Sequence, residues 1–206
     1  MSYALSSQHM PNLVLDRGHV AHRWRTERWN SLRLLTPNFL NRLPGWEYQG
    51  SDPDGFMTVP EFIAWLEGYA HSFDAPIQTG VNVQRVRKEG QLFEIHTGQQ
   101  RWLARSLVIA TGHCDVPYIP PIAQGLDGSI DQLVPSNYKQ PAQLAPGGVL
   151  IVGSGATGVQ LAEELAEAGR RVFLSVGTHR RRPRNYLGKD ILWWACLLYT
   201  SDAADD

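Results

Sequence analysis

The architecture of this chain follows from the sequence Val149-Leu150-Ile151-Val152-Gly153-Ser154-Gly155-Ala156-Thr157-Gly158. Its first four residues are apolar, which predicts a fully buried parallel strand. The residues from 159 to 169 have helical spacing and end at a glycine suited to a C-terminal cap, and 171–176 predict a second strand. A complete strand–turn–helix–strand unit makes the G-x-G-x-x-G pattern a specific signal for a dinucleotide-binding turn.

Each glycine of this turn is predicted to have its own role. Gly153 would allow the tight turn, Gly155 would let the backbone approach a pyrophosphate, and Gly158 would let the helix pack on the strand. The anion would lie at the N-terminus of the helix, where free N–H groups and the helix dipole favour negative charge. The alternative is a glycine-rich strand–helix junction without a ligand, which the complete unit disfavours.

The composition is that of a globular protein, with 206 residues, 43% hydrophobic and 19% charged. A formal net charge of −1 gives no reason to expect nucleic acid or an anionic membrane as partner. Cys114 and Cys196 form neither a C-x-x-C pair nor a zinc spacing, which favours a reducing, cytoplasmic compartment and argues against disulfide exchange. His19 and His22 lack a third ligand nearby, so we expect no metal site.

Both ends of the chain are unusual. Residues 1–10 predict the later turns of a helix, and Asn12–Asp16 predicts a short buried strand that ends in an acid. This is the second half of another dinucleotide-binding unit, in which Asp16 would accept hydrogen bonds from a ribose. Its first half is missing, so we expect Met1 to be an internal methionine. Residues 196–206 resemble a translated frame of the transposase adapter used in sequencing libraries, and a natural acidic tail is the alternative.

The middle of the chain predicts an α/β fold with a small antiparallel layer. Thr58–Glu61 is a capping box, and the helix that it opens has an aromatic face that we interpret as core. Val81–Ile95 predicts an antiparallel hairpin, which Trp102 and Leu103 continue. Residues 107–110 predict a buried strand that ends at Thr111-Gly112, where the backbone could approach a ligand. His113 and Cys114 are adjacent, and neighbours on an extended chain point apart, so we expect no catalytic pair.

The segment Ala110-Thr111-Gly112-x4-Pro117-x2-Pro120, followed by the Gly153–Gly158 turn, resembles the flavin-containing monooxygenase type of two-dinucleotide-binding flavoprotein. This group of FAD- and NAD(P)-dependent oxidoreductases lies close to the plant indole-pyruvate monooxygenases. The resemblance implies a Rossmann-like FAD/NAD(P)-binding three-layer fold, truncated at both ends. It implies a partial FAD-binding domain at 1–143, a partial NADPH-binding domain at 144–195 and a non-native tail at 196–206. The family's Phe-x-Gly fingerprint is degenerate here, at Leu126-Asp127-Gly128, and its histidine is absent, which argues against assignment to the N-oxygenating branch.

The resemblance also implies which residues hold the two cofactors, FAD and NADPH. The implied FAD contacts are Asp16 at the adenosine ribose, Arg23 and Trp24 in a flavin-cofactor loop, Val83 at the adenine, and Thr111 and Gly112 beside the cofactor. The implied NADPH contacts are Gly153, Ser154, Gly155, Ala156, Thr157 and Gly158. Asn38 falls near the place where the family has flavin-facing polar residues.

The preference for NADPH over NADH also has support from the residues themselves. An NAD site has an acid at the end of the second strand, where this chain has Ser175–Thr178. Arg180, Arg181 and Arg182 follow, and guanidinium groups suit a 2′-phosphate. A solvated basic loop is the alternative.

The activity that the resemblance implies is a monooxygenase reaction. NADPH reduces FAD, and O2 then oxygenates a small organic substrate, so the chemistry needs no identifiable catalytic side chain. Two alternatives stay open: an FAD-dependent NADPH reductase or oxidase without oxygenation, and an inactive nucleotide-binding remnant. We expect the chain, if truncated, to be inactive by itself.

Overall fold

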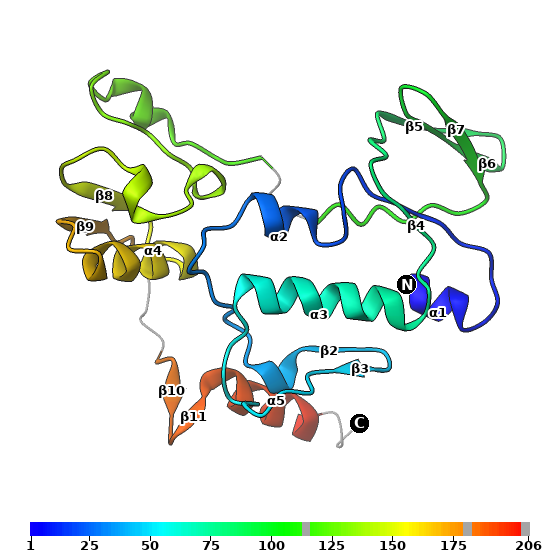
Figure 1. Ribbon diagram of the computed structural model, residues 1–206, viewed down its shortest axis with the longest axis horizontal. Helices are drawn as coiled ribbons and strands as arrows, with labels where there is room; N and C mark the ends of the chain where they lie inside the picture. The colour runs from blue at the N-terminus through cyan, green and yellow to red at the C-terminus, as the bar shows by residue number, and fades with distance from the viewer. Residues whose placement is uncertain (113–115, 179–182, 203–206) are drawn as a thin grey trace. The chain divides into compact units, whose positions relative to one another are not determined.

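The structure is a computed structural model that describes residues 1–112, 116–178 and 183–202 (Figure 1). The chain divides into two compact units. The first unit comprises Met1–Thr26 and Leu66–Val134, and the second comprises Glu27–Trp65 and Pro135–Asp206. The predicted boundaries at residues 143 and 195 divide the chain differently and stay predictions.

The first unit combines short helices with a parallel and an antiparallel sheet. Its elements are α1 (Ser2–Ser6), β1 (Val14–Leu15), α2 (His22–Thr26), the second part of α3 (Val59–Ser72), β4 (Ile77–Gln78), β5 (Arg85–Glu89), β6 (Leu92–His96), β7 (Arg101–Ala104) and η2 (Pro121–Gly125).

The parallel sheet of the first unit joins β1 to β4, with Val14 opposite Ile77 and Leu15 opposite Gln78. A strand over Asn12–Asp16 was predicted, and the structure confirms the strand but limits it to Val14–Leu15, with Asp16 directly after it. The strand is half-buried rather than buried, and the Leu13 side chain before it is 49% exposed. Burial is incomplete because this sheet has only two strands among the described residues.

The antiparallel layer of the first unit has the strand order β5-β6-β7, which confirms the predicted hairpin and its continuation. The hairpin turns at Gly90, whose φ of 60° lies in the left-handed region that favours glycine. Ile95 of β6 is buried at 4% exposure and gives this layer its packed centre.

The prediction of a strand at residues 107–110 is wrong. Within the described chain these residues belong to no strand, and Val108 and Ile109 are 58% and 77% exposed. An apolar run becomes a buried strand only where a neighbouring strand pairs with it and a second layer covers it. Neither is present beside this run among the described residues.

The second unit contains the glycine turn. Its elements are η1 (Asn38–Leu40), β2 (Arg42–Leu43), β3 (Trp46–Glu47), the first part of α3, η3 (Pro135–Asn137), η4 (Pro141–Gln143), β8 (Val149–Val152), α4 (Ala156–Glu167), β9 (Val172–Ser175), β10 (Asn185–Tyr186), β11 (Lys189–Asp190) and α5 (Ile191–Asp202).

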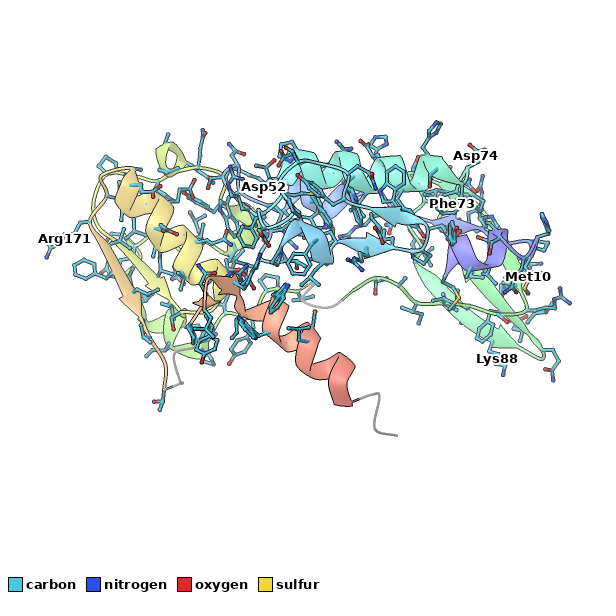
Figure 2. The ribbon with its side chains drawn as sticks, turned by 90° about the horizontal axis from the view of Figure 1, so that it is seen from below. Met10, Asp52, Phe73, Asp74, Lys88 and Arg171 are labelled. Carbon is cyan, nitrogen blue, oxygen red and sulfur yellow. The ribbon has the colours of Figure 1, made fainter. Side chains whose placement is uncertain are left out.

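Helix α3 begins at the predicted capping box. The Thr58 N–H donates to the Glu61 carboxylate at 2.7 Å, and the Glu61 N–H donates to the Thr58 hydroxyl at 3.4 Å. The buried side chains of α3 are Val59 and Ile63, so the aromatic face is not the most buried face of the helix. Its members pair locally instead, as Phe73, labelled in Figure 2, does with Tyr69 at 5.2 Å between ring centroids.

Strands β8 and β9 form a parallel pair, with Val149 opposite Val172 and Val152 opposite Ser175. Helix α4 packs against both strands, which confirms the predicted β–turn–α–β unit (Figure 1). The prediction of a fully buried strand is wrong, because Leu150 and Val152 are 63% and 72% exposed. Their face of the sheet has no covering layer among the described residues, and on it the Arg171 guanidinium lies over the exposed Phe173 ring (Figure 2).

Helix α5 runs from Ile191 to Asp202 and so continues into the segment predicted to be a non-native tail. The origin of that tail stays a prediction. None of the helices in the described ranges combines the length and the apolar character that a membrane crossing requires.

Candidate functional site

The glycine turn begins directly after β8. Gly153 has a φ of 105°, a conformation that L side chains rarely adopt. Its N–H donates to the Ser175 carbonyl at 3.0 Å, which ties the start of the turn to the carboxyl end of β9. The predicted role of Gly153 in a tight turn therefore has a geometric basis.

The third glycine of the motif packs against the first. A Cβ on Gly158 would lie 1.9 Å from the Gly153 carbonyl oxygen and 3.5 Å from the Ile151 Cγ2 atom. Real Cβ atoms do not come this close to a backbone oxygen, so only glycine fits at this point of the helix. The close approach of α4 to β8 depends on this absence of a side chain.

The middle glycine faces open space. Gly155 is the N-cap of α4, with φ −70° and ψ 179°, and a Cβ there would meet no atom within 4 Å. Any residue can adopt this backbone conformation. Gly155 is therefore not required by the fold, and the open space beside it is available to a ligand.

The first turn of α4 offers N–H groups to that space. The first intrahelical bond runs from the Val159 N–H to the Gly155 carbonyl at 3.0 Å, so Ala156, Thr157 and Gly158 precede it. Within the described part of the chain, no side chain caps the helix. Gly153, Ser154 and Gly155 line a surface pocket together with Gly177, which follows β9. Free N–H donors, the positive end of the helix dipole and a wall without side chains suit a phosphate or pyrophosphate group.

The predicted 2′-phosphate residues Arg180, Arg181 and Arg182 lie outside the described residues, as do His113 and Cys114. The chain on either side of the arginines is described. Gly177 lines the pocket at the glycine turn, and Arg184 directly precedes β10. The assignment of the three arginines to a 2′-phosphate stays a prediction.

A second candidate site lies in the first unit, around Asp16. The Asp16 Oδ1 atom accepts a bond from the Gly18 N–H at 2.9 Å. The Asp16 N–H donates to the Gln78 carbonyl, and the Asp16 carbonyl accepts from the Val81 N–H. The carboxylate is thus fixed at the carboxyl end of β1, where an open α/β sheet binds its ligand.

A pocket next to this strand end was missed by sequence reasoning. It lies between the chain that follows β4 and the turn that joins β6 to β7. Its lining residues are Gln78, Thr79, Gly80, Val81, Asn82, Gln84, Thr97, Gly98, Gln99 and Gln100. Val83, predicted to contact an adenine, is 38% exposed and lies between two of these residues in the sequence. The only sequence signal was Thr79-Gly80 after a short apolar pair, a typical end of a parallel strand.

The other predicted FAD residues are not brought to this pocket. Arg23 and Trp24 lie half-buried on α2. Thr111 and Gly112 are exposed, and Gly112 has a φ of 76° with open space beside it. None of the four lines either pocket. Their assignment to FAD stays a prediction.

Asn38 is the most buried polar side chain near the start of η1, at 4% exposure. Its Nδ2 atom donates to the Asp52 carbonyl at 2.8 Å, and its backbone N–H donates to the Gly55 carbonyl at 2.8 Å. Its Oδ1 atom is buried and has no hydrogen-bond partner among the described residues. The contacts of Asn38 hold the turn at residues 52–55, which accounts for its burial.

A parallel β–turn–α–β unit with these three glycines defines a dinucleotide-binding α/β protein of the Rossmann type. The chain belongs to the pyridine nucleotide-disulphide oxidoreductase family, whose model matches residues 1–190. These 206 residues contain no C-x-x-C motif.

Individual relatives agree with this family. The chain is 38% identical over 197 residues to an uncharacterized CzcO-like oxidoreductase from Geobacillus kaustophilus, covering 94% of this chain and 56% of the relative. It is 25% identical to the probable indole-3-pyruvate monooxygenase YUCCA3 from Arabidopsis thaliana, and the match covers 90% of this chain and 45% of that relative. Among solved structures, a flavin monooxygenase mutant from Stenotrophomonas maltophilia matches with a TM-score of 0.76 at 25% identity. The match covers 90% of this chain and 56% of that structure's chain. These matches confirm the resemblance to flavin monooxygenase-type oxidoreductases, and the chain spans about half the length of the relatives.

Proposed function

We propose that this chain contributes the NADPH-binding turn, and part of the FAD-binding region, of a flavoprotein monooxygenase. The proposed reaction uses NADPH to reduce FAD and O2 to oxygenate a small organic substrate. The observation that carries the proposal is the glycine turn, in which Gly158 lies against the Gly153 carbonyl while Gly155 faces an open pocket. The Stenotrophomonas relative is a flavin monooxygenase and the Arabidopsis relative is a probable indole-3-pyruvate monooxygenase, which supports the oxygenation step.

The proposal gives each group a binding role. The N–H groups of Ala156, Thr157 and Gly158 would donate to the pyrophosphate of NADPH, and Gly155 would admit it. The Asp16 carboxylate would accept bonds from the adenosine ribose of FAD. FAD, when bound, supplies the acceptor for hydride and the chemistry with O2, and the protein supplies binding, orientation and exclusion of water.

The oxygenase assignment is tested on a whole protein that contains this sequence, supplied with FAD and candidate carbonyl or sulfide substrates. We expect one NADPH and one O2 to be consumed for each oxygenated product, measured by absorbance, an oxygen electrode and mass spectrometry. NADPH consumption that yields only hydrogen peroxide, with every substrate, would contradict oxygenation and favour the oxidase alternative.

A further inference from the structure

The pocket near Asp16 is lined by uncharged residues in the described chain, and half of these residues carry a side-chain amide. The amides belong to Gln78, Asn82, Gln84, Gln99 and Gln100. The cavity volume of about 390 Å³ lies within the range of small-molecule sites. An amide presents a donor and an acceptor side by side, as the edge of a nucleobase does. The lining therefore suits an uncharged heterocycle better than a phosphate group, which takes cationic partners.

Two of the five amides are paired with each other, and three are open to a ligand. The Gln78 Nε2 atom donates to the Gln100 Oε1 atom at 3.4 Å, which joins the end of β4 to residues 97–100, the 97–100 turn. The side-chain amides of Asn82, Gln84 and Gln99 make no hydrogen bond within the described part of the chain. Their donors and acceptors are available to a bound molecule.

The 97–100 turn is a fixed wall of the pocket. The Thr97 N–H donates to the Gln100 carbonyl at 3.0 Å, and the Gln100 N–H donates to the Thr97 hydroxyl at 3.0 Å. The Gln84 N–H donates to the His96 carbonyl at 2.8 Å, so the opposite wall is joined to the residue that precedes the turn. Little backbone entropy is left to lose when this turn contacts a ligand.

Glu94 holds the two strands at the base of this turn. The residue is buried at 6% exposure, and its Oε2 atom lies 3.0 Å from the His96 Nε2 atom. Its Oε1 atom accepts from the Arg101 Nη1 atom at 2.7 Å. His96 ends β6, Arg101 begins β7, and the two are direct cross-strand partners. The hydrogen bond from His96 is the main cause that lowers the pKa of Glu94, which keeps the carboxylate ionised at neutral pH.

Asp16 is bonded to the lining of the pocket through its backbone. Its N–H donates to the Gln78 carbonyl at 3.1 Å, and its carbonyl accepts from the Val81 N–H at 2.8 Å. A ribose held by the Asp16 carboxylate would therefore have its base beside the pocket.

We propose that the 97–100 turn forms one wall of the site for that base, which is adenine in FAD. In this site Gln99 contacts the base as a specificity-determining residue, and Glu94 is the positioning residue of the turn. The inference rests on the proposed FAD contact of Asp16. It extends that contact to a turn of the antiparallel layer.

The experiment is an NMR titration of the ¹⁵N-labelled 206-residue chain with adenosine. This probe carries no phosphate, so its binding does not depend on the glycine turn. We expect adenosine to shift the backbone amide signals of residues 80–84 and 97–100. Ribose alone should leave the 97–100 signals in place. Unshifted 97–100 signals at millimolar adenosine, or equal shifts with ribose, would overturn the inference.

Gln99→Ala tests the contact with the base. We expect about a fivefold loss of adenosine affinity, the effect of one lost hydrogen bond. Gln91→Ala is the matched control, because Gln91 is exposed and lies in the turn between β5 and β6, at the other end of the same sheet. It should leave the affinity unchanged. Equal affinities of the two variants would remove Gln99 from the site.

Glu94→Gln tests the positioning role. A glutamine has one acceptor oxygen, so it cannot accept from both His96 and Arg101, and we expect about a fivefold loss of adenosine affinity. Glu89→Gln is the same chemical change at an exposed residue of β5 and should have no effect. Unchanged affinity in Glu94→Gln would overturn the role. If circular dichroism shows that Glu94→Gln is unfolded, Arg101→Met replaces it, since the Arg101 side chain is 60% exposed.

A parallel titration with NADPH separates this inference from the proposed function. NADPH should shift the amide signals of residues 153–158 equally in the unmodified chain and in Glu94→Gln, which a general loss of structure would not allow. Adenosine shifts at 97–100 without NADPH shifts at 153–158 would refute the NADPH site and keep the base site. NADPH shifts at 153–158 without adenosine shifts at 97–100 would do the reverse.

Discussion

Gly158 lies directly against Gly153, so that a Cβ on Gly158 would come 1.9 Å from the Gly153 carbonyl oxygen. The contact brings the first turn of α4 onto the end of β8, next to the pocket that Gly153, Ser154, Gly155 and Gly177 line. Gly158 is required for the packing of α4 on β8, whereas Gly155 leaves space for a ligand. Substitutions at the two positions should therefore have different effects.

Gly158→Ala is expected to destabilise the chain. The methyl group has no room, so α4 must move away from β8, and overpacking of this kind costs about 1–3 kcal/mol. Urea denaturation followed by circular dichroism measures the change. Gly125→Ala is the control, since a Cβ there meets nothing within 4 Å. Equal stability of Gly158→Ala and the unmodified chain would contradict the packing described for the turn.

The linker before β8 is fastened to α4 by Tyr138. This side chain is buried at 4% exposure, and its hydroxyl donates to the Glu164 Oε2 atom at 2.9 Å. Burial, followed by the hydrogen bond to Glu164 and its negative charge, raises the pKa of Tyr138 far above its usual range. The tyrosine hydroxyl is therefore a neutral hydrogen-bond donor at pH 7.

Tyr138→Phe should lower the free energy of unfolding by about 1 kcal/mol, the net contribution of a typical hydrogen bond. Tyr118→Phe is its matched control, because Tyr118 is 82% exposed. Thermal denaturation at pH 7 compares the two variants. If both leave the midpoint unchanged, the Tyr138–Glu164 bond does not hold the linker on α4.

The capping box of α3 gives a prediction about pH. The Thr58 N–H and hydroxyl both donate to the Glu61 carboxylate, and these bonds, the backbone one first, lower the pKa of Glu61. A depressed carboxyl pKa contributes stability that is present above the unfolded-state pKa, about 4.3, and is lost as the pH falls through the lower folded-state value.

Glu61→Gln keeps a capping side chain but removes this titration, so the variant should lose less stability than the unmodified chain between pH 5 and acid conditions. Thr58→Ala should lower the free energy of unfolding by about 1 kcal/mol at pH 7, because it removes the N-cap side chain. Denaturation curves at a series of pH values measure both effects. Parallel pH profiles for Glu61→Gln and the unmodified chain would show that the carboxylate is not held by the cap.

Local features of this fold could be predicted from the sequence. The turn at Gly153–Gly158, the Gly90 hairpin and the Thr58 capping box each depend on residues within a few positions of one another. Their geometry is set by backbone conformation and short-range hydrogen bonds. Sequence patterns record such constraints directly.

Features that depend on distant partners could not be predicted. Residues 107–110 have the composition of a buried strand but no strand to pair with among the described residues. The pocket near Asp16 joins the chain after β4 to a turn at 97–100, and Arg184 meets Leu35 and Phe56 across a long sequence separation. No local pattern specifies these meetings, because tertiary packing decides them.

The three arginines give a prediction about selectivity. Replacement of Arg180, Arg181 and Arg182 by alanine should weaken NADPH binding far more than NADH binding, because only NADPH carries the 2′-phosphate that guanidinium groups would hold. Titration with both nucleotides at one ionic strength measures the ratio. Equal losses for the two nucleotides would remove the phosphate argument and favour a solvated basic loop.

Gly155→Ala separates ligand binding from folding at the glycine turn. The methyl group meets no protein atom within 4 Å and the φ of −70° suits alanine, so the melting temperature should fall only slightly, by the cost of alanine at an N-cap position. The same methyl group projects toward the space proposed for the pyrophosphate, so titration calorimetry should show at least about a tenfold loss of affinity for NADPH, or about 1.4 kcal/mol. NADPH binding by Gly155→Ala that equals that of the unmodified chain would contradict the assignment of this turn as the NADPH site.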